Sequence, residues 1–208
     1  MPFGPAWVCW TGRTEGDLGR TASAEQRAAV YDGPWASLRQ VHGATVRVVA
    51  DSSSAAPAVG DALLSTRRGV ALAVVTADCA PVALVSDNDV IAIAHGGWRG
   101  LREGVLRATV AAMRARGGEH IEAILGPCIR PCCYEFGAAD LADMVRAFGA
   151  SVATDAGALD LPAVVRADLH RLGINLEEHG ACTSCSPGWF SHRARAETER
   201  QASLVMLA

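Results

Sequence analysis

Lysine is absent from the 208 residues, so all 19 basic residues are arginines. A Schiff-base lysine, a lysine anchor for pyridoxal phosphate and a P-loop of the GxxxxGK[ST] type are therefore excluded. Any cationic contact to an anion must come from arginine, protonated histidine or backbone N–H groups.

Long hydrophobic runs are also missing, since none approaches the ~20 residues of a membrane helix. The first ten residues have no charged segment and are interrupted by proline and glycine, so we expect no signal peptide and no membrane partner. The net charge is -3 and no basic stripe gathers the arginines, which argues against nucleic acid. Seven cysteines would leave one unpaired in a secreted protein, so we expect free thiols in a cytoplasmic monomer or homodimer.

Half of the residues are apolar, enough for a core, and the length favours one domain over residues 1–208. Hydrophobic patterning predicts buried strands, two of them in a hairpin, alternating with amphipathic helices, which favours an α/β or α+β layered domain. The first 35 residues and 51–60 are expected to be irregular. The predicted strands are 69–79, 80–87, 90–95, 121–125 and 202–208, and the predicted helices are 101–116, 138–149 and 161–172.

Two histidines and a cysteine end apolar segments in QVHG, TADCAP and AHGGWRG. His42, Cys79 and His95 offer two imidazoles and a thiolate, a donor set that suits Zn²⁺ or copper and leaves one position open for water or substrate. Without a metal, Cys79 beside a histidine would be an activated nucleophile. Alternatively, all three are ordinary buried or turn residues.

An anion site is indicated just after His95. Gly96 and Gly97 leave backbone N–H groups uncrowded before a helix, and Arg99 adds a positive charge. The alternative is a capping turn with Arg99 in solvent. Arg193, in FSHR, is a second candidate cation that could equally be a surface charge.

The remaining cysteines point less clearly to a site. Cys132 and Cys133 are adjacent, and we expect that they cannot both face one ion without strain. Cys182 and Cys185 form a CxxC, but no second CxxC accompanies it, which disfavours a zinc ribbon. The Pro-Gly that follows disfavours a thioredoxin-like helix. Cys9 is expected to be structural, and Cys128 has no assigned role.

Together, the segments QVHG, ADALLST, TADCAPVAL, IAIAHGGWRGL, ILGPCIRPCCYEFG, CTSC and WFSHRAR–RQASLV resemble, in this order, the laccase-domain family. The resemblance covers about residues 38–207. That family carries the name multicopper polyphenol oxidase and is described as purine nucleoside phosphorylases with adenosine deaminase activity. Six histidines are too few for the copper centres of a multicopper oxidase.

The resemblance implies a four-layer α/β/β/α sandwich with mixed sheets, and a zinc, or copper, site at His42, Cys79 and His95. It implies phosphorolysis of adenosine, inosine and methylthioadenosine with orthophosphate, and deamination of adenosine. Arg99 and the Gly96-Gly97 turn are then candidates for the phosphate. Asp78 could orient a ligand or act as a general acid/base, or make a structural hydrogen bond.

The N-terminal region departs from the family pattern. The turn around Arg13 resembles the family's arginine turn and makes Arg13 a further candidate for substrate binding, but no asparagine precedes Asn88. A shortened segment there could alter nucleoside specificity. Two alternatives therefore stand: a peptidoglycan editing factor that acts on muropeptide precursors, and a metal-binding module without catalysis.

Overall fold

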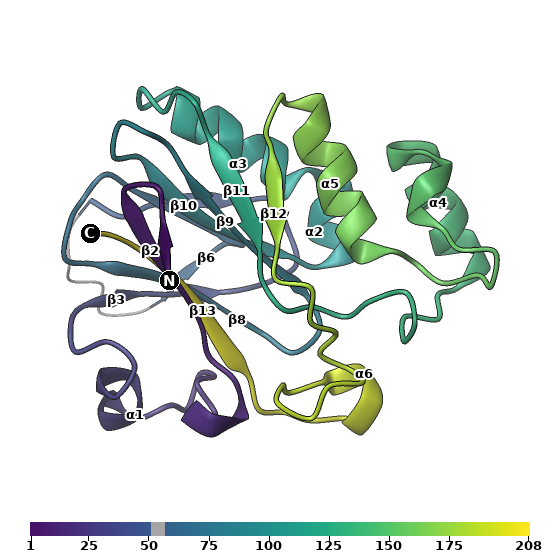
Figure 1. Ribbon diagram of the computed structural model, residues 1–208, viewed down its shortest axis with the longest axis horizontal. Helices are drawn as coiled ribbons and strands as arrows, with labels where there is room; N and C mark the ends of the chain where they lie inside the picture. The colour runs from purple at the N-terminus through teal and green to yellow at the C-terminus, as the bar shows by residue number, and fades with distance from the viewer. Residues whose placement is uncertain (51–56) are drawn as a thin grey trace.

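The computed structural model describes residues 1–50 and 57–208 (Figure 1). Strands make up two main sheets, and most helices lie against one of them. The strands are β1 (Pro2–Phe3), β2 (Ala6–Trp10), β3 (Trp35–Ala36), β4 (Leu38–Arg39), β5 (Val46–Val48), β6 (Ala58–Val59), β7 (Ala62–Ser65), β8 (Ala71–Thr76), β9 (Ala80–Val85), β10 (Ile91–Gly96), β11 (Glu122–Leu125), β12 (Leu176–Glu178) and β13 (Gln201–Leu207). The helices are α1 (Ala24–Ala28), α2 (Trp98–Glu103), α3 (Val105–Arg114), α4 (Ala138–Phe148), α5 (Leu161–Arg171) and α6 (His192–Arg195), with 3₁₀ turns η1 (Arg13–Glu15) and η2 (Ala150–Val152).

The five-stranded sheet has the order β1-β2-β13-β8-β3, so the C-terminal strand lies at its centre. β13 is antiparallel to both β2 and β8, and β3 is parallel to β8. The six-stranded sheet has the order β12-β11-β9-β10-β7-β5 and is also mixed. The predicted hairpin is its β9–β10 pair, in which Val85 faces Ile91. A short pair, β4 and β6, stands apart.

Three apolar clusters separate four layers. The first lies between the six-stranded sheet and α2–α5, and it buries the predicted helix stripe of Val105, Val110 and Met113. The second lies between the two sheets. The third covers the outer face of the five-stranded sheet with the N-terminal segment, including Leu18. Figure 1 shows α1 on that side, opposite α3 and α5. The expected α+β sandwich with mixed sheets is therefore confirmed.

Several predicted elements differ from the observed ones. The predicted helix 101–116 begins earlier and breaks at Gly104, whose φ of 99° lies in the left-handed region that favours glycine. The first 35 residues are not irregular, because they supply β1, β2, η1, α1 and the start of β3. Of the predicted loop 51–60, residues 51–56 lie outside the described residues, and 58–59 form β6. Among the described residues, no helix is long and apolar enough to span a bilayer.

Candidate active site

The chain changes sheets at the proposed site. β8 ends at Thr76 in the five-stranded sheet and β9 starts at Ala80 in the six-stranded one, so Cys79 lies in the turn that joins the two. His95 is the last residue but one of β10, directly beside β9, where it pairs with Pro81. Because both strands are in one sheet, a packed core sets the positions of both side chains.

Cys79, His42 and His95 come together from sequence positions that are far apart. The Cys79 sulfur lies 3.8 Å from His42 Nε2, and the three donor atoms are all within 4.8 Å of one another. The two imidazole rings meet edge to face, with centroids 4.7 Å apart. His95 is buried, Cys79 is half-buried and His42 is exposed, so the group opens to solvent on the His42 side.

A buried carboxylate, Asp61, holds both histidines. It accepts hydrogen bonds from the backbone N–H groups of Val41, His42 and Gly43, at 2.8 Å for the last two. Its Oδ1 also lies 2.9 Å from His95 Nδ1, which leaves Nε2 of His95 free to face the site. Sequence reasoning missed Asp61, although an acidic residue at the start of a buried strand needs partners.

The charges of these groups are coupled. Burial opposes ionisation of Asp61, but hydrogen bonds from His95 and the Gly43 N–H lower its pKa overall. Burial also opposes the Cys79 thiolate, but the charge of His95 and hydrogen bonds from His42 and His95 lower the Cys79 pKa to about 6. Burial disfavours the His95 cation, yet Cys79 and Asp61 raise the His95 pKa to about 9. The thiolate, which is the form that binds metals, is therefore favoured at neutral pH.

The His42 loop packs tightly against the start of α2. His42 has a φ of 60°, a conformation that few non-glycine residues adopt. A Cβ added at Gly97 would lie 2.5 Å from His42 Cδ2, and one at Gly100 would lie 2.8 Å from the Gly43 carbonyl oxygen. A Cβ at Gly96 would meet the Ala80 carbonyl oxygen at 2.7 Å. Close packing thus requires the glycines of HGGWRG whether or not they also contact an anion.

A cleft of about 660 Å³ opens beside the three donors. Its wall includes His42, Cys79 and His95. It also has three arginines that the sequence did not single out, Arg20, Arg39 and Arg200, and the ring of His192. A second hollow of about 390 Å³ adjoins this cleft. The residues that line both include Arg20, Arg39, Gln40 and Val75. The second hollow is more apolar, because Leu18 and Trp35 also line it.

The predicted anion contacts separate into two groups. Exposed Arg99 stacks on Trp98 at 4.4 Å, and exposed Arg193 stacks on Tyr134 at 5.0 Å. Both arginine charges act on the Tyr134 phenol, whose pKa is nonetheless raised, mainly by burial. Arg13 lies elsewhere, paired with Glu197 and stacked on the ring of Phe190.

Asp78 is buried and makes structural hydrogen bonds. Its carboxylate accepts from the Thr183 hydroxyl and from the Arg193 backbone N–H, both at 2.7 Å. Its own carbonyl accepts from the Ile129 N–H at 2.8 Å. Asp78 therefore ties the Cys79 turn to two loops of the second half of the chain.

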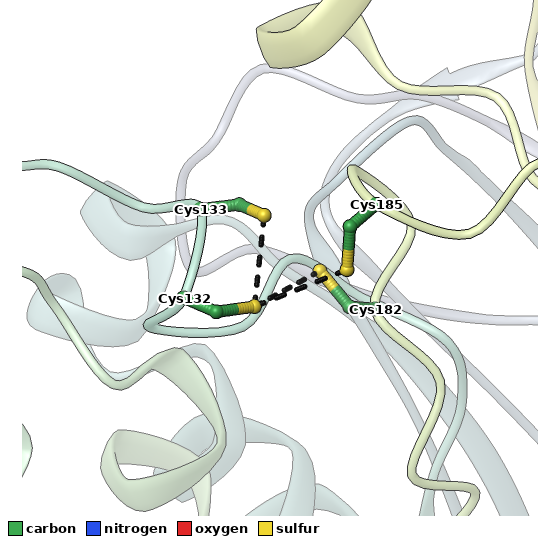
Figure 2. Close-up of side chains that lie close together, drawn as sticks. All are labelled: Cys132, Cys133, Cys182 and Cys185. Atoms are coloured by element: carbon green, nitrogen blue, oxygen red, sulfur yellow. Dashed lines mark hydrogen bonds between the residues drawn. The ribbon is translucent and has the colours of Figure 1, made fainter.

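The adjacent cysteines do converge with the CxxC, contrary to expectation. Cys133 N–H bonds the Arg130 carbonyl in a tight turn, and the turn directs the Cys132 and Cys133 sulfurs to the same side, 3.6 Å apart (Figure 2). Cys182 and Cys185 complete a group whose sulfurs all lie within 4.8 Å. A second CxxC is therefore not needed to bring four sulfurs together, because the adjacent Cys132 and Cys133 supply the other two from one turn.

The donors at His42, Cys79 and His95 fit a metal ion. Zn–S and Zn–N bonds of about 2.3 and 2.1 Å at tetrahedral angles separate the donors by roughly 3.6 Å. The observed distance from the Cys79 sulfur to His42 Nε2 is 3.8 Å. A carboxylate behind a histidine, as Asp61 stands behind His95, is the usual support of a metal-binding imidazole.

Comparison with known proteins agrees with this arrangement of motifs. The profile of the family described as multi-copper polyphenol oxidoreductase laccase matches residues 18–208. The chain belongs to that family. The profile match starts at residue 18, after Arg13, whereas a purine nucleoside phosphorylase of Streptomyces griseus, 36% identical, aligns with 98% of this chain and 75% of its own length.

Relatives and solved structures agree with the family assignment. A purine nucleoside phosphorylase of Xylella fastidiosa is 38% identical over 192 residues, covering 82% of this chain and 71% of the relative. One of Streptomyces coelicolor is 39% identical over 178 residues, covering 82% and 74%. YlmD from Geobacillus stearothermophilus superposes with a TM-score of 0.84 at 26% identity, over 99% of this chain and 93% of that one. A Neisseria meningitidis protein gives 0.82 at 32% identity, over 92% and 86%.

Proposed function

We propose that this chain is a purine nucleoside phosphorylase. In this reaction an oxygen of orthophosphate bonds to C1′ of the ribose, and the bond from C1′ to the purine nitrogen breaks. The products are the free base and ribose 1-phosphate. The observation that carries the proposal is the group of His42, Cys79 and His95 on the wall of a cleft, in a chain whose relatives bear that name.

We further propose that His42, Cys79 and His95 hold a zinc ion, with copper as the alternative metal. When bound by three protein ligands, zinc acts as a Lewis acid and lowers the pKa of a bound water to about 7. Asp61 positions the His95 and His42 donors through its hydrogen bonds. Asp78 positions the Cys79 turn, because both of its carboxylate oxygens are already engaged.

Without lysine, the phosphate contact falls to arginines and backbone N–H groups. We propose Arg99 and Arg193, which lie on the Tyr134 side of the site, together with the Gly96-Gly97 turn. Arg13 has a weaker case, since Glu197 already pairs with it. The expected outcome for Arg99→Ala and Arg193→Ala is a higher KM for phosphate with little change in the KM for the nucleoside.

We propose adenosine, inosine and methylthioadenosine as substrates, and deamination of adenosine as a second activity. Deamination adds water to the purine carbon and releases ammonia. Three protein donors leave room for a fourth ligand at the metal, which is what water activation requires. None of the seven cysteines, all of which lie in the described residues, forms a disulfide, which suits the proposed cytoplasmic location.

Chromatography of adenosine incubated with zinc-loaded protein, with and without phosphate, tests the proposal. Adenine that forms only with phosphate is the expected product of phosphorolysis. Inosine without phosphate, and inosine or the hypoxanthine formed from it with phosphate, are the expected products of deamination. Cys79→Ala should abolish both, whereas Cys9→Ala, a matched change away from the cleft, should retain them. Absence of both products refutes the proposal and favours a muropeptide substrate or a module without catalysis.

A further inference from the structure

Four thiols from two loops form a second cluster, separate from the cleft. Figure 2 shows Cys132 and Cys133 on one loop facing Cys182 and Cys185 on the other. The Cys132 sulfur lies 3.6 Å from that of Cys133, 3.8 Å from that of Cys182 and 4.0 Å from that of Cys185.

These separations match the edges of one tetrahedron. Four sulfurs at Zn–S distances of about 2.3 Å lie roughly 3.8 Å apart, because a tetrahedron's edge is about 1.6 times its centre-to-corner distance. A disulfide would need a sulfur–sulfur distance of about 2.05 Å. Since Cys132 lies at nearly equal distances from the other three sulfurs, no pair is singled out for oxidation.

Hydrogen bonds from Arg195 hold the loop that carries Cys182 and Cys185. Arg195 donates to the carbonyls of Ser184 at 3.0 Å and Thr183 at 3.4 Å. Its guanidinium also pairs with Glu197 at 3.1 Å, so Arg195 holds the loop that carries two of the thiols against the chain around α6.

We propose that Cys132, Cys133, Cys182 and Cys185 bind one Zn²⁺ ion as thiolates, with their protons released to solvent. Four protein ligands close the coordination sphere, so this ion has a structural role, unlike the open three-donor site. Tetrahedral four-sulfur sites select zinc or iron, and the ion that we propose here is zinc.

The proposed ion would join the two loops that hold the active-site turn. Thr183 lies next to Cys182, and its hydroxyl donates to Asp78, the neighbour of Cys79. Cys182 also lies beside Cys128 in an isolated bridge, and the Thr183 N–H bonds the Cys128 carbonyl at 3.1 Å. The loops that follow β11 and β12 are therefore hydrogen-bonded to each other, and the second of them is also hydrogen-bonded to Asp78.

Metal analysis in a Cys79→Ala background separates the two sites. We expect Cys79→Ala protein to retain one zinc ion per chain and Cys79→Ala/Cys185→Ser protein to contain none. Cys79→Ala/Cys9→Ser is the matched control, since Cys9 lies in β2 away from both sites, and it should keep its ion. Cobalt in place of zinc should give the intense sulfur-to-metal absorption of four thiolates in the Cys79→Ala protein.

A second measurement does not depend on whether the Cys185→Ser variant folds. Titration of the Cys79→Ala protein with a mercurial should release one zinc ion, detected with a chromogenic chelator. The proposal is overturned if Cys79→Ala protein contains no zinc and takes up neither zinc nor cobalt. Iron in place of zinc, or a mass deficit of two hydrogens that marks a disulfide, also refutes it. Activity in the adenosine assay has no bearing on these outcomes.

Discussion

Replacement of Asp61 by asparagine tests the support of both histidines with one atom changed. Asp61 is fully buried and accepts hydrogen bonds from three backbone N–H groups and from His95. The carboxamide keeps one acceptor oxygen and places its NH₂ against an N–H that it cannot satisfy. We therefore expect His42 and its left-handed backbone to loosen, and His95 to lose its charged partner.

The expected magnitude follows from the bonds lost. A hydrogen bond to a charged group contributes about 1.5–3 kcal/mol, and an unsatisfied buried N–H costs about 1–3 kcal/mol. Asp61→Asn should therefore destabilise the protein by about 3–5 kcal/mol. For a chain of this length 1 kcal/mol moves Tm by roughly 2–4 °C, so a fall on the order of 10 °C is expected. Zinc affinity at the three-donor site should fall about 10- to 100-fold, the usual effect of removing a ligand's supporting partner.

Thermal unfolding of metal-free protein measures the change in Tm, and competition with a chelator measures the zinc affinity. Asp143→Asn is the matched control, because Asp143 is a surface acid paired with Arg102 and Arg146 and should change stability by no more than about 1 kcal/mol. Zinc affinity is measured in the Cys185→Ser background for both Asp61→Asn and its control, so that only the three-donor site contributes to the measured affinity. An Asp61→Asn protein with unchanged Tm and unchanged zinc affinity would refute the reasoning.

Three further changes have defined outcomes. Gly97→Ala should displace the His42 ring and weaken zinc binding at least several-fold by the same competition assay, whereas Gly137→Ala, where a Cβ meets nothing within 4 Å, should not. Glu197 is partly desolvated, but hydrogen bonds from a backbone N–H and two arginines lower its pKa to about 2, so its stabilisation is present above its ordinary value of 4.5 and lost as pH falls towards 2. Melting curves of wild type and Glu197→Gln should therefore differ at pH 6 and converge at pH 2; equal curves at pH 6 contradict this. Arg99→Ala should raise the KM for phosphate, and saturation kinetics with an unchanged KM would remove Arg99 from the site.

Local pattern was sufficient for much of the fold. Strand 80–87 and strand 90–95 were predicted because apolar runs flank an Asp-Asn-Asp turn, and the observed pair confirms them. The helices at 138–149 and 161–172 end within one residue of the observed α4 and α5, since their apolar stripes pack on the sheet. The break of the predicted helix 101–116 at Gly104 was not predicted, because the sequence does not show which φ a single glycine adopts inside an amphipathic pattern.

The site was only partly accessible to sequence reasoning. The motifs identified His42, Cys79 and His95, whose convergence depends on a chain that changes sheets, a tertiary feature that periodicity does not encode. Asp61 was missed because its role depends on backbone N–H groups about twenty positions away. The cysteine cluster was misjudged because ligand spacing was considered along the chain, whereas the turn at Arg130–Cys133 determines where the sulfurs point.

The central place of β13 has a kinetic consequence. Residues 201–207 pair with β2, about 195 positions earlier, and with β8, so the five-stranded sheet cannot close until this segment has left the ribosome. Such distant pairing makes folding slow, because a long loop must be ordered before its contacts form. The emerging chain therefore carries an open β8 edge during synthesis. Chains that end before residue 201 should aggregate rather than accumulate as folded fragments.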